Sequence, residues 1–198
     1  MKVFVFDADG VVCVGANFGG ALEKEHRIPR SRLAPFFAGP FPGCIVGKHD
    51  LKEELAAYLP QWGWRGSVEE FLAFWFQREH VLCPYILACV RTLRSKGHIC
   101  VLATNQERYR TEYLRSEMGL AKEFDHVFPS CELAVAKPAR EFFIRVQERL
   151  RQTADNLCLI DDSEKNLLGA AAVGWSTIHY RNTSDILRIE DEARQRSA

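Results

Sequence analysis

The sequence predicts an α/β fold, in which a doubly wound parallel sheet carries helices on both faces and a smaller helical domain is inserted into it. From Pro84 onward, short apolar segments typical of buried strands alternate with amphipathic segments typical of helices. A first apolar run at residues 3–6 is separated from the others by a long stretch of helical character. We therefore predict a core domain of residues 1–14 and 83–198, and a second domain of residues 15–82.

The core strands are predicted from apolar, β-branched or aromatic runs that are too short for helices. These runs lie at residues 3–6, 98–103, 126–129, 156–160 and 176–179. The helices between them are predicted at 85–96, 107–118, 139–151 and 164–173, with a polar helix or frayed tail at 184–196. Gly97, Gly119 and Gly174 end three of these helices, since glycine readily adopts a helix C-cap conformation.

Residues 15–82 are predicted to be helical with interruptions. Helices are expected at 16–27 and 31–37, followed by an irregular loop that is indicated by Pro35, Pro40, Pro42 and Gly43. Asp50 is a good N-cap for the next helix, and Ser67 with Glu70 forms a capping box for the one after it. The last of these helices carries an apolar stripe of Phe71, Leu72, Trp75 and Phe76.

Composition narrows the classes of function. Of 198 residues, 47% are hydrophobic, and 26 basic residues balance 26 acidic ones, so the formal net charge is zero. A neutral chain has no bulk attraction to nucleic acid or to an anionic membrane, and no apolar run approaches the ~20 residues of a membrane span. The seven cysteines lack metal-site spacing and suit reduced, mostly buried thiols in a cytoplasmic protein. The oligomeric state stays open between monomer and homodimer.

Polar side chains follow four of the predicted strands near the point where each strand ends. In chain order they are Asp7 and Asp9, Thr104-Asn105, Lys137-Pro138, and Asp161-Asp162. Each pair by itself is better explained by a turn, a helix cap or a helix start. However, ligands of open parallel sheets bind outside the carboxyl ends of the strands, so the joint placement of these residues favours one shared site.

The residue types in this site suit phosphoryl transfer. Clustered carboxylates repel one another unless a cation lies among them, and all-oxygen ligands suit Mg²⁺. Lys137 and Thr104 could hold phosphate oxygens. One carboxylate can attack phosphorus, while a second can protonate the leaving oxygen and then activate water.

The segment Asp7-Ala8-Asp9-Gly10-Val11 and the three later pairs, in this order, resemble the four motifs of the haloacid dehalogenase-like (HAD) hydrolase superfamily. Residues 15–82 resemble its C1-type helical cap, and residues 160–175 are similar to its phosphatase-like members. The resemblance spans nearly the whole chain and implies a Rossmann-like core with a helical cap domain.

This resemblance implies a role for each motif residue. Asp7 is the expected nucleophile, Asp9 the general acid and base, and Lys137 the residue that steadies the aspartyl-phosphate. The expected phosphate-binding residues are Gly10, Thr104, Asn105 and Lys137. The expected Mg²⁺ ligands are Asp7, the backbone carbonyl of Asp9, Asp162 directly, and Asp161 through water.

The implied function is a Mg²⁺-dependent phosphatase acting on a small phosphorylated metabolite. Asp9 separates the chain from the dehalogenases themselves, whose family pattern lacks an acid two residues after the nucleophile. Two alternatives stay open: a phosphomutase, with Lys48 and His49 as candidates for a second anionic group, and a non-catalytic phosphate-binding module. The charged residues Glu107, Arg108 and Arg110 are predicted to form the solvated start of a helix.

Overall fold

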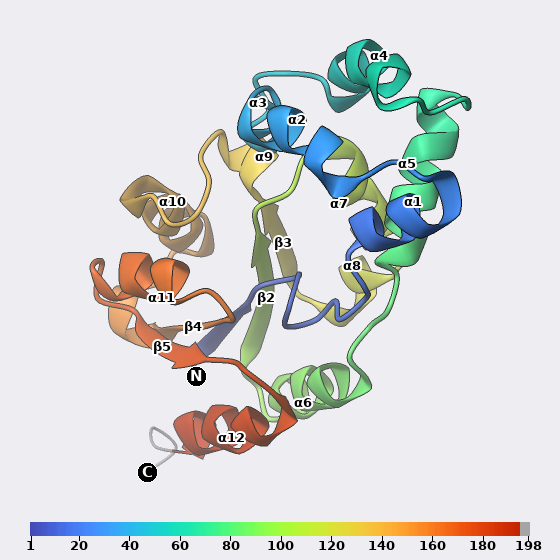
Figure 1. Cartoon of the computed structure of the whole chain (residues 1–198). Helices are drawn as coiled ribbons and strands as arrows, with labels where there is room; N and C mark the ends of the chain where they lie inside the picture. Colours follow the sequence, from blue (N-terminus) through green and yellow to red (C-terminus); the bar gives the residue numbers. More distant parts are fainter. Residues whose placement is uncertain (195–198) are drawn as a thin grey trace.

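The computed structural model describes residues 1–194 and has a five-stranded parallel sheet at its centre (Figure 1). The order is β3-β2-β1-β4-β5, with bounds β1 (Val3–Phe6), β2 (Ile99–Thr104), β3 (His126–Pro129), β4 (Leu157–Asp161) and β5 (Ser176–His179). The central strand β1 pairs with β2 and β4, so that Phe6 lies opposite both Leu102 and Ile160. The predicted α/β fold is therefore confirmed.

Helices cover both faces of the sheet. One face carries α9 (Ser130–Leu133), α10 (Arg140–Leu150) and α11 (Glu164–Ala171), and the other carries α6 (Pro84–Ser95), α7 (Arg108–Arg115), α8 (Leu120–Glu123) and α12 (Ile186–Arg194). In β1, Val3 and Val5 pack into a hydrophobic cluster with α9, α10 and α11. Phe4 and Phe6 pack into a second cluster on the opposite face, with α6, α7, α8 and α12. This alternation follows from the two-residue period of a strand and produces a sheet that is buried on both faces.

The strand predictions are accurate to about one residue, and the helix predictions are less complete. Strands β2 and β4 each lie one residue further along than predicted, so Thr104 and Asp161 end their strands. The four-residue helices α8 and α9 were not predicted, because single turns carry no periodic signal. The predicted helix at 184–196 corresponds to a 3₁₀ turn, Thr183–Asp185, followed by α12, and its last two residues lie outside the described part of the chain.

The inserted segment, residues 15–82, holds five α-helices. They are α1 (Phe18–His26), α2 (Ala34–Ala38), α3 (Phe41–Ile45), α4 (Leu51–Trp62) and α5 (Val68–Arg78), with a 3₁₀ turn at Arg30–Arg32. The predicted helix at 31–37 is wrong, because this stretch divides into the 3₁₀ turn and α2. The predicted irregular loop is also wrong, since Pro35 and Pro42 lie in the first turns of α2 and α3, where no backbone N–H donor is needed.

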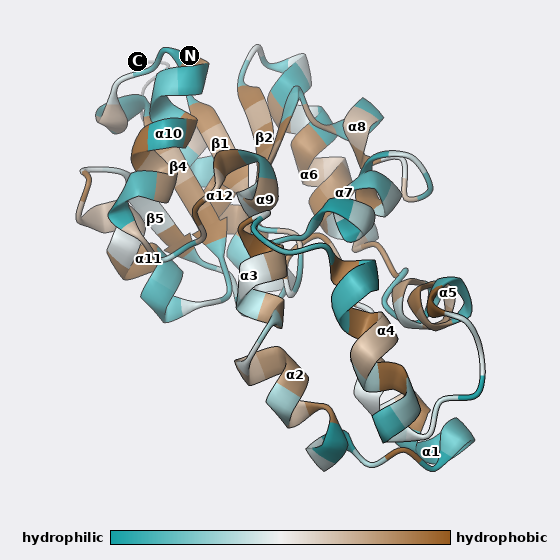
Figure 2. Cartoon of the chain, turned by 90° about the horizontal axis from the view of Figure 1, so that it is seen from above, coloured by the Kyte–Doolittle hydropathy of each residue, from teal (hydrophilic) through white to brown (hydrophobic). Residues whose placement is uncertain are grey.

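The helix caps predicted in the inserted segment are confirmed. The Asp50 carboxylate accepts hydrogen bonds from the first turn of α4, and Ser67 and Glu70 form a reciprocal capping box at α5. The apolar faces of these helices pack together in a third hydrophobic cluster, separate from the two clusters of the sheet. Figure 2 shows the five helices set to one side of the sheet.

The two ends of the inserted segment run side by side. The backbone N–H of Val14 donates to the Val81 carbonyl at 2.8 Å, and that of Cys83 donates to the Val12 carbonyl at 2.8 Å. Both connections therefore leave the core close to the carboxyl end of β1. The exact domain boundaries at residues 14 and 83 stay a prediction.

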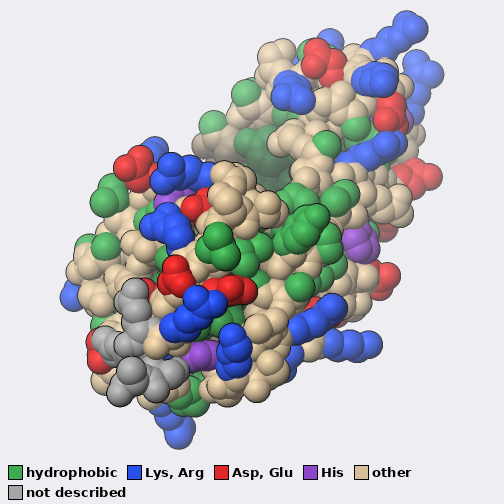
Figure 3. All heavy atoms as spheres, turned by 90° about the horizontal axis from the view of Figure 1, so that it is seen from below, with side chains coloured by type: hydrophobic (Ala, Val, Ile, Leu, Met, Phe, Trp, Pro, Cys, Tyr) green, Lys and Arg blue, Asp and Glu red, His purple; other side chains and the backbone are tan. Residues whose placement is uncertain are grey.

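The surface charges are mixed and the cysteines are free and mostly buried, as the composition predicts. Acidic and basic side chains lie next to one another on the face seen from below (Figure 3). All seven cysteines are free, and all except Cys131 are buried. None of the helices in residues 1–194 is long and apolar enough to span a membrane.

Candidate active site

Three carboxylates meet at the carboxyl edge of the sheet. Asp7 follows β1, Asp161 ends β4, and Asp162 is the next residue. One oxygen from each of the three lies within 4.8 Å of the others. Asp7 and Asp161 are buried, whereas Asp162 is exposed. An all-carboxylate donor set of this kind suits a hard divalent cation such as Mg²⁺.

Lys137 lies between two of these carboxylates. Its Nζ atom is 2.9 Å from Asp7 Oδ1 and donates to Asp161 Oδ2 at 2.7 Å, and the residue is only 5% exposed. Asp161 also accepts from the Asn166 side chain and from the Ser163 backbone N–H. Both oxygens of Asp161 are thus engaged by the protein.

Burial and mutual repulsion control the protonation of this group. Burial raises the pKa of Asp7 to about 7; Lys137 acts in the opposite direction, and the Asp161 and Asp9 carboxylates add to the rise. Burial alone would lower the pKa of Lys137, but Asp7 and Asp161 together raise it above the ordinary value. Lys137 is therefore a cation at neutral pH, and the site favours additional positive charge near Asp7.

The second motif positions Lys137. The Asn105 amide nitrogen donates to the Lys137 carbonyl at 2.9 Å, and the Lys137 backbone N–H donates to Asn105 Oδ1 at 2.8 Å. Both polar atoms of the Asn105 side chain are thus engaged by the backbone of Lys137. Thr104 is buried at the end of β2, next to this contact in the chain. The roles of both residues toward phosphate stay predictions.

Gly10 turns the chain directly behind Asp9. Its φ angle is +80°, a conformation that side-chain-bearing residues rarely adopt. A Cβ atom at this position would lie 2.3 Å from Asp162 Oδ2. Glycine is therefore required both by the turn and by the close approach of Asp162.

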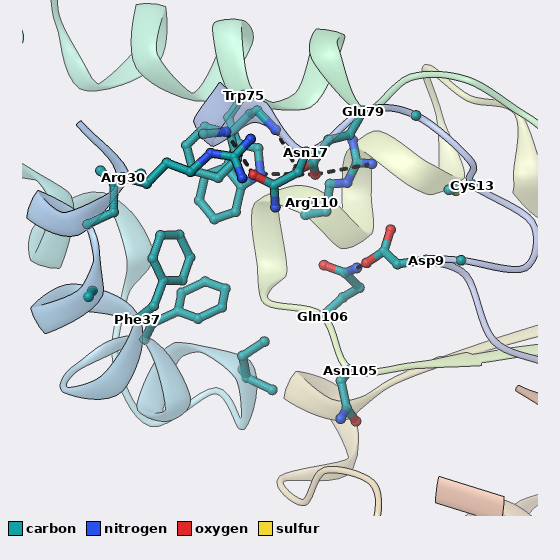
Figure 4. Close-up of a pocket in the computed structure, with 18 residues that line it drawn as sticks. Asp9, Cys13, Asn17, Arg30, Phe37, Trp75, Glu79, Asn105, Gln106 and Arg110 are labelled. Atoms are coloured by element: carbon teal, nitrogen blue, oxygen red, sulfur yellow. Dashed lines mark hydrogen bonds and ion pairs between the residues drawn. The ribbon is translucent and has the colours of Figure 1, made fainter. Parts of the chain in front are cut away.

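Asp9 lies at one end of a cavity of about 550 Å³ between the core and the inserted segment (Figure 4). Its Oδ2 accepts a hydrogen bond from Gln106 Nε2 at 2.5 Å. Asp9 is accessible from the cavity, yet the surrounding protein desolvates its carboxyl and raises its pKa, while Arg110 acts in the opposite direction. A carboxyl with a raised pKa at a cavity suits general acid chemistry.

Most residues that line this cavity were not identified from the sequence, among them Gln106, Arg110 and Glu79. The prediction of a solvated helix start is wrong for Glu107 and Arg110, which are only 2% and 3% exposed, and holds for Arg108. Glu107 turns inward because it caps α7 through the N–H groups of Tyr109 and Arg110. The four-residue spacing of Arg110 and the buried Leu114 was a usable signal, since it places both on one helix face.

Lys48 and His49 lie in a different place. They line a separate cavity of about 390 Å³ together with Asp50, Glu107 and Arg108. His49 Nδ1 lies 3.0 Å from Glu54. Neither residue lines the cavity at Asp9, so neither is placed to hold a second anionic group there.

A family model described as haloacid dehalogenase-like hydrolase matches residues 1–174, which contain all the residues of this site. The chain belongs to the haloacid dehalogenase-like hydrolase family. The predicted resemblance is thus confirmed, and the protein is a hydrolase.

Individual HAD relatives are distant and differ in their chemistry. Bifunctional epoxide hydrolase 2 of Rattus norvegicus is 24% identical across 95% of this chain, but the chain spans only 38% of that relative's length. A HAD family enzyme of Bacteroides thetaiotaomicron, solved with magnesium and inorganic phosphate, has a TM-score of 0.78 and 21% identity, with 91% of this chain and 94% of that chain covered.

A third relative carries a different ligand. The L-2-haloacid dehalogenase of Xanthobacter autotrophicus, solved with covalently bound chloropropionic acid, has a TM-score of 0.67 and 21% identity, with 98% of this chain and 84% of that chain covered. At these identities the two solved structures show a shared fold and no more.

Proposed function

We propose that this HAD hydrolase is a Mg²⁺-dependent phosphatase, which hydrolyses a small phosphomonoester through an aspartyl-phosphate on Asp7. The observation that supports this most strongly is the Lys137 ammonium group, held 2.9 Å from Asp7 with Asp162 alongside. A fixed cation next to the nucleophile is suited to the equatorial oxygens of a phosphoryl group. Asp9, at the cavity, supplies the acid that an alkoxide leaving group needs.

The reaction would take place in two steps. In the first, a carboxylate oxygen of Asp7 forms a bond to phosphorus, the ester P–O bond breaks, and Asp9 gives its proton to the leaving oxygen. In the second, the Asp9 carboxylate takes a proton from a water molecule, whose oxygen attacks phosphorus and displaces Asp7. Gln106, bonded to Asp9 Oδ2, keeps this carboxyl oriented between the two steps.

The residues present fit Mg²⁺. Asp7, Asp162 and the backbone carbonyl of Asp9 would hold the ion, with Asp161 acting through water. The exposed carboxylate of Asp162 and the fully engaged oxygens of Asp161 support this division. When bound, Mg²⁺ would neutralise the charge of the phosphate group. The magnesium and phosphate in the Bacteroides relative support the same assignment.

The test is a panel of phosphomonoesters incubated with the purified protein, with Mg²⁺ or with a chelator. We expect phosphate release that requires Mg²⁺. The same preparation is assayed for chloride release from 2-chloropropionate and for opening of an epoxide, because one relative is a haloacid dehalogenase and another an epoxide hydrolase. Chloride or diol formation that exceeds phosphate release would contradict the proposal.

The alternatives have less support. A phosphomutase needs a site for a second anionic group, and the two candidate residues for that site, Lys48 and His49, line another cavity. A non-catalytic phosphate-binding module does not explain why the acids and Lys137 are all present at one site. Binding of phosphate analogues without turnover of any ester would favour the module. We also propose that the protein is a cytoplasmic monomer or homodimer, and that its partner is a small metabolite and not nucleic acid or a membrane. The zero net charge and the free cysteines support this part of the proposal.

Replacing Asp9 tests its proposed role as general acid. We expect Asp9→Asn to lower kcat for an alkyl phosphate by about 10²–10⁴-fold, since the leaving oxygen and the attacking water lose their proton relay. For p-nitrophenyl phosphate, whose leaving group is a weak base, the loss in the first step should be smaller. Burst kinetics with both esters measure this difference. Equal losses for the two esters, or normal rates for both, would remove Asp9 from the role of general acid.

The close approach at Gly10 gives a second prediction. Gly10→Ala should lower the apparent affinity for Mg²⁺ by about tenfold, because its Cβ displaces the Asp162 carboxylate, and substitutions that disturb the orientation of a metal ligand have effects of this size. Gly97→Ala is the matched control, with φ +82° against +80° and no atom within 4 Å of the added Cβ. Both variants pay about 1–2 kcal/mol for the left-handed backbone. Mg²⁺ titrations of phosphate release that shift equally in the two variants would refute the steric argument.

A further inference from the structure

Gln106 provides the hydrogen bond that orients the Asp9 carboxyl. Its Nε2 atom donates to Asp9 Oδ2 at 2.5 Å, and within residues 1–194 no other group hydrogen-bonds this carboxyl. Figure 4 shows the two side chains pointing toward one another at the cavity. A general acid must lie within hydrogen-bond reach of the leaving oxygen, so the first step of the proposed reaction depends on where Gln106 is held.

Regular secondary structure does not fix the backbone at Gln106. The residue lies in the short connection between β2 and α7, and it is only 6% exposed. The start of α9 holds its peptide groups instead. Ser130 Oγ accepts a hydrogen bond from the Gln106 N–H at 3.0 Å, and the Cys131 N–H donates to the Gln106 carbonyl at 3.3 Å. The start of α9 therefore sets the position from which the Gln106 side chain reaches Asp9.

The Ser130 hydroxyl is itself held in one orientation. Its single hydrogen is donated to the Ile45 carbonyl, at the end of α3 in the inserted segment, over 2.6 Å, and its lone pairs are then free to face the Gln106 N–H. The other acceptor within reach, the Gln106 carbonyl, lies farther away at 3.3 Å. Ser130 is fully buried and does not line the cavity at Asp9. This hydroxyl thus joins α3, α9 and the connection after β2 without reaching the substrate.

Given the proposed phosphatase activity, we infer that Ser130 is a positioning residue for the general-acid step. Its hydroxyl fixes the backbone of Gln106, and the Gln106 amide in turn fixes the Asp9 carboxyl beside the leaving oxygen. An alanine at position 130 leaves the buried Gln106 N–H without its acceptor, and the connection after β2 is then free to shift. Because Ser130 touches no reacting atom, its loss affects proton transfer to the leaving oxygen and not the binding of the substrate.

The test compares two esters whose leaving groups differ in basicity. Benzyl phosphate and p-nitrophenyl phosphate each carry one ring, but the benzyl alkoxide needs a proton as it leaves, whereas p-nitrophenolate does not. With Mg²⁺ present, we expect Ser130→Ala to lower the first-turnover rate constant for benzyl phosphate by about 10–100-fold, as a small misplacement of a reacting group does. The rate constant for p-nitrophenyl phosphate should change little, and so should KM for both esters.

Ser176→Ala is the matched control. The Ser176 hydroxyl also donates to a backbone carbonyl, that of Leu157 at 3.1 Å, but both residues lie at the first positions of their strands, away from the carboxyl edge of the sheet. This variant should leave the ratio of the two rate constants unchanged. Equal losses for the two esters in Ser130→Ala would show a merely structural role, and an unchanged ratio would equally overturn the inference. If Ser130→Ala fails to fold, Ser130→Cys, whose thiol is a weak donor and acceptor, takes its place.

A double substitution tests the route through Gln106. Gln106→Leu removes the hydrogen bond to Asp9 and should lower the ratio at least as far as Ser130→Ala does. Adding Ser130→Ala to Gln106→Leu should then produce no further fall, since two residues that act through one contact are not additive. Falls that multiply would contradict the inference. Absence of phosphate release by the wild type would refute the phosphatase proposal itself, whereas normal release with an unchanged ratio refutes only the role of Ser130.

Discussion

Asp7→Asn is expected to abolish phosphate release, with a loss in kcat of about 10³–10⁶-fold, as is usual when a nucleophile is removed. An amide oxygen cannot form the aspartyl-phosphate at a useful rate. Asparagine has nearly the same shape as aspartate, so the packing around Phe6 and Lys137 should be kept. Single-turnover assays with p-nitrophenyl phosphate and Mg²⁺ measure the loss. Undiminished turnover would refute the covalent mechanism on Asp7.

The same substitution should stabilise the metal-free protein at alkaline pH. Burial raises the pKa of Asp7 to about 7, above the unfolded value near 3.8. Between these values the folded state holds a proton that the unfolded state has released, so the free energy of unfolding contributed by Asp7 falls as pH rises from about 4 to about 7. Asparagine carries no charge at any pH, so the free energy of unfolding of the variant lacks this decrease.

Thermal unfolding in the presence of a chelator tests this sign. The Tm of Asp7→Asn should exceed that of the wild type at pH 8, and the difference should shrink toward pH 4. Asp191→Asn, which changes an exposed carboxylate on α12, should show no such pH-dependent gain. A Tm of Asp7→Asn below that of the wild type at pH 8 would show that the Lys137 contact outweighs the burial of the charge.

Much of the fold could be predicted because its signals are local. The strands are short apolar runs, and the motif residues lie where these runs end, so the sheet topology brings Asp7, Lys137 and Asp162 together. The errors in the inserted segment arose where one local rule has two outcomes. A proline breaks a helix interior but begins a helix equally well, and Pro35 and Pro42 do the latter.

The cavity could not be predicted in the same way, because its walls come from distant parts of the chain. Arg110 lies near the start of α7 and Glu79 just after α5, so the ion pair between them joins distant parts of the chain. A charged residue near a helix start is usually solvated. Arg110 is buried through tertiary contacts with Glu79, with the backbone carbonyl of Phe76 and with the rings of Phe76 and Tyr113. Strand ends thus predict the candidate site, whereas the cavity depends on packing between the core and the inserted segment.

Lys137→Met should produce the largest loss of stability among single substitutions at the site. Methionine fills a similar volume but leaves the buried Asp7 and Asp161 carboxylates facing each other without the cation between them. Breaking a buried ion pair by removing one partner costs about 3–5 kcal/mol. Lys52→Met, which breaks the exposed pair with Glu69, is the matched control and should cost about 0–1 kcal/mol. Urea unfolding at pH 8 compares the two, and equal losses would contradict the buried-pair argument.

The physical cause of that loss can be separated from a simple packing defect by adding Mg²⁺. If repulsion between Asp7 and Asp161 destabilises Lys137→Met, a divalent cation among the carboxylates should restore part of the lost charge balance. Mg²⁺ should then raise the Tm of Lys137→Met more than that of the wild type, and lowering the pH to 5 without Mg²⁺ should also narrow the gap by protonating Asp7. A packing defect responds to neither treatment. Phosphate release should remain low even in the Mg²⁺-restored variant, since the ammonium group next to the nucleophile is still missing.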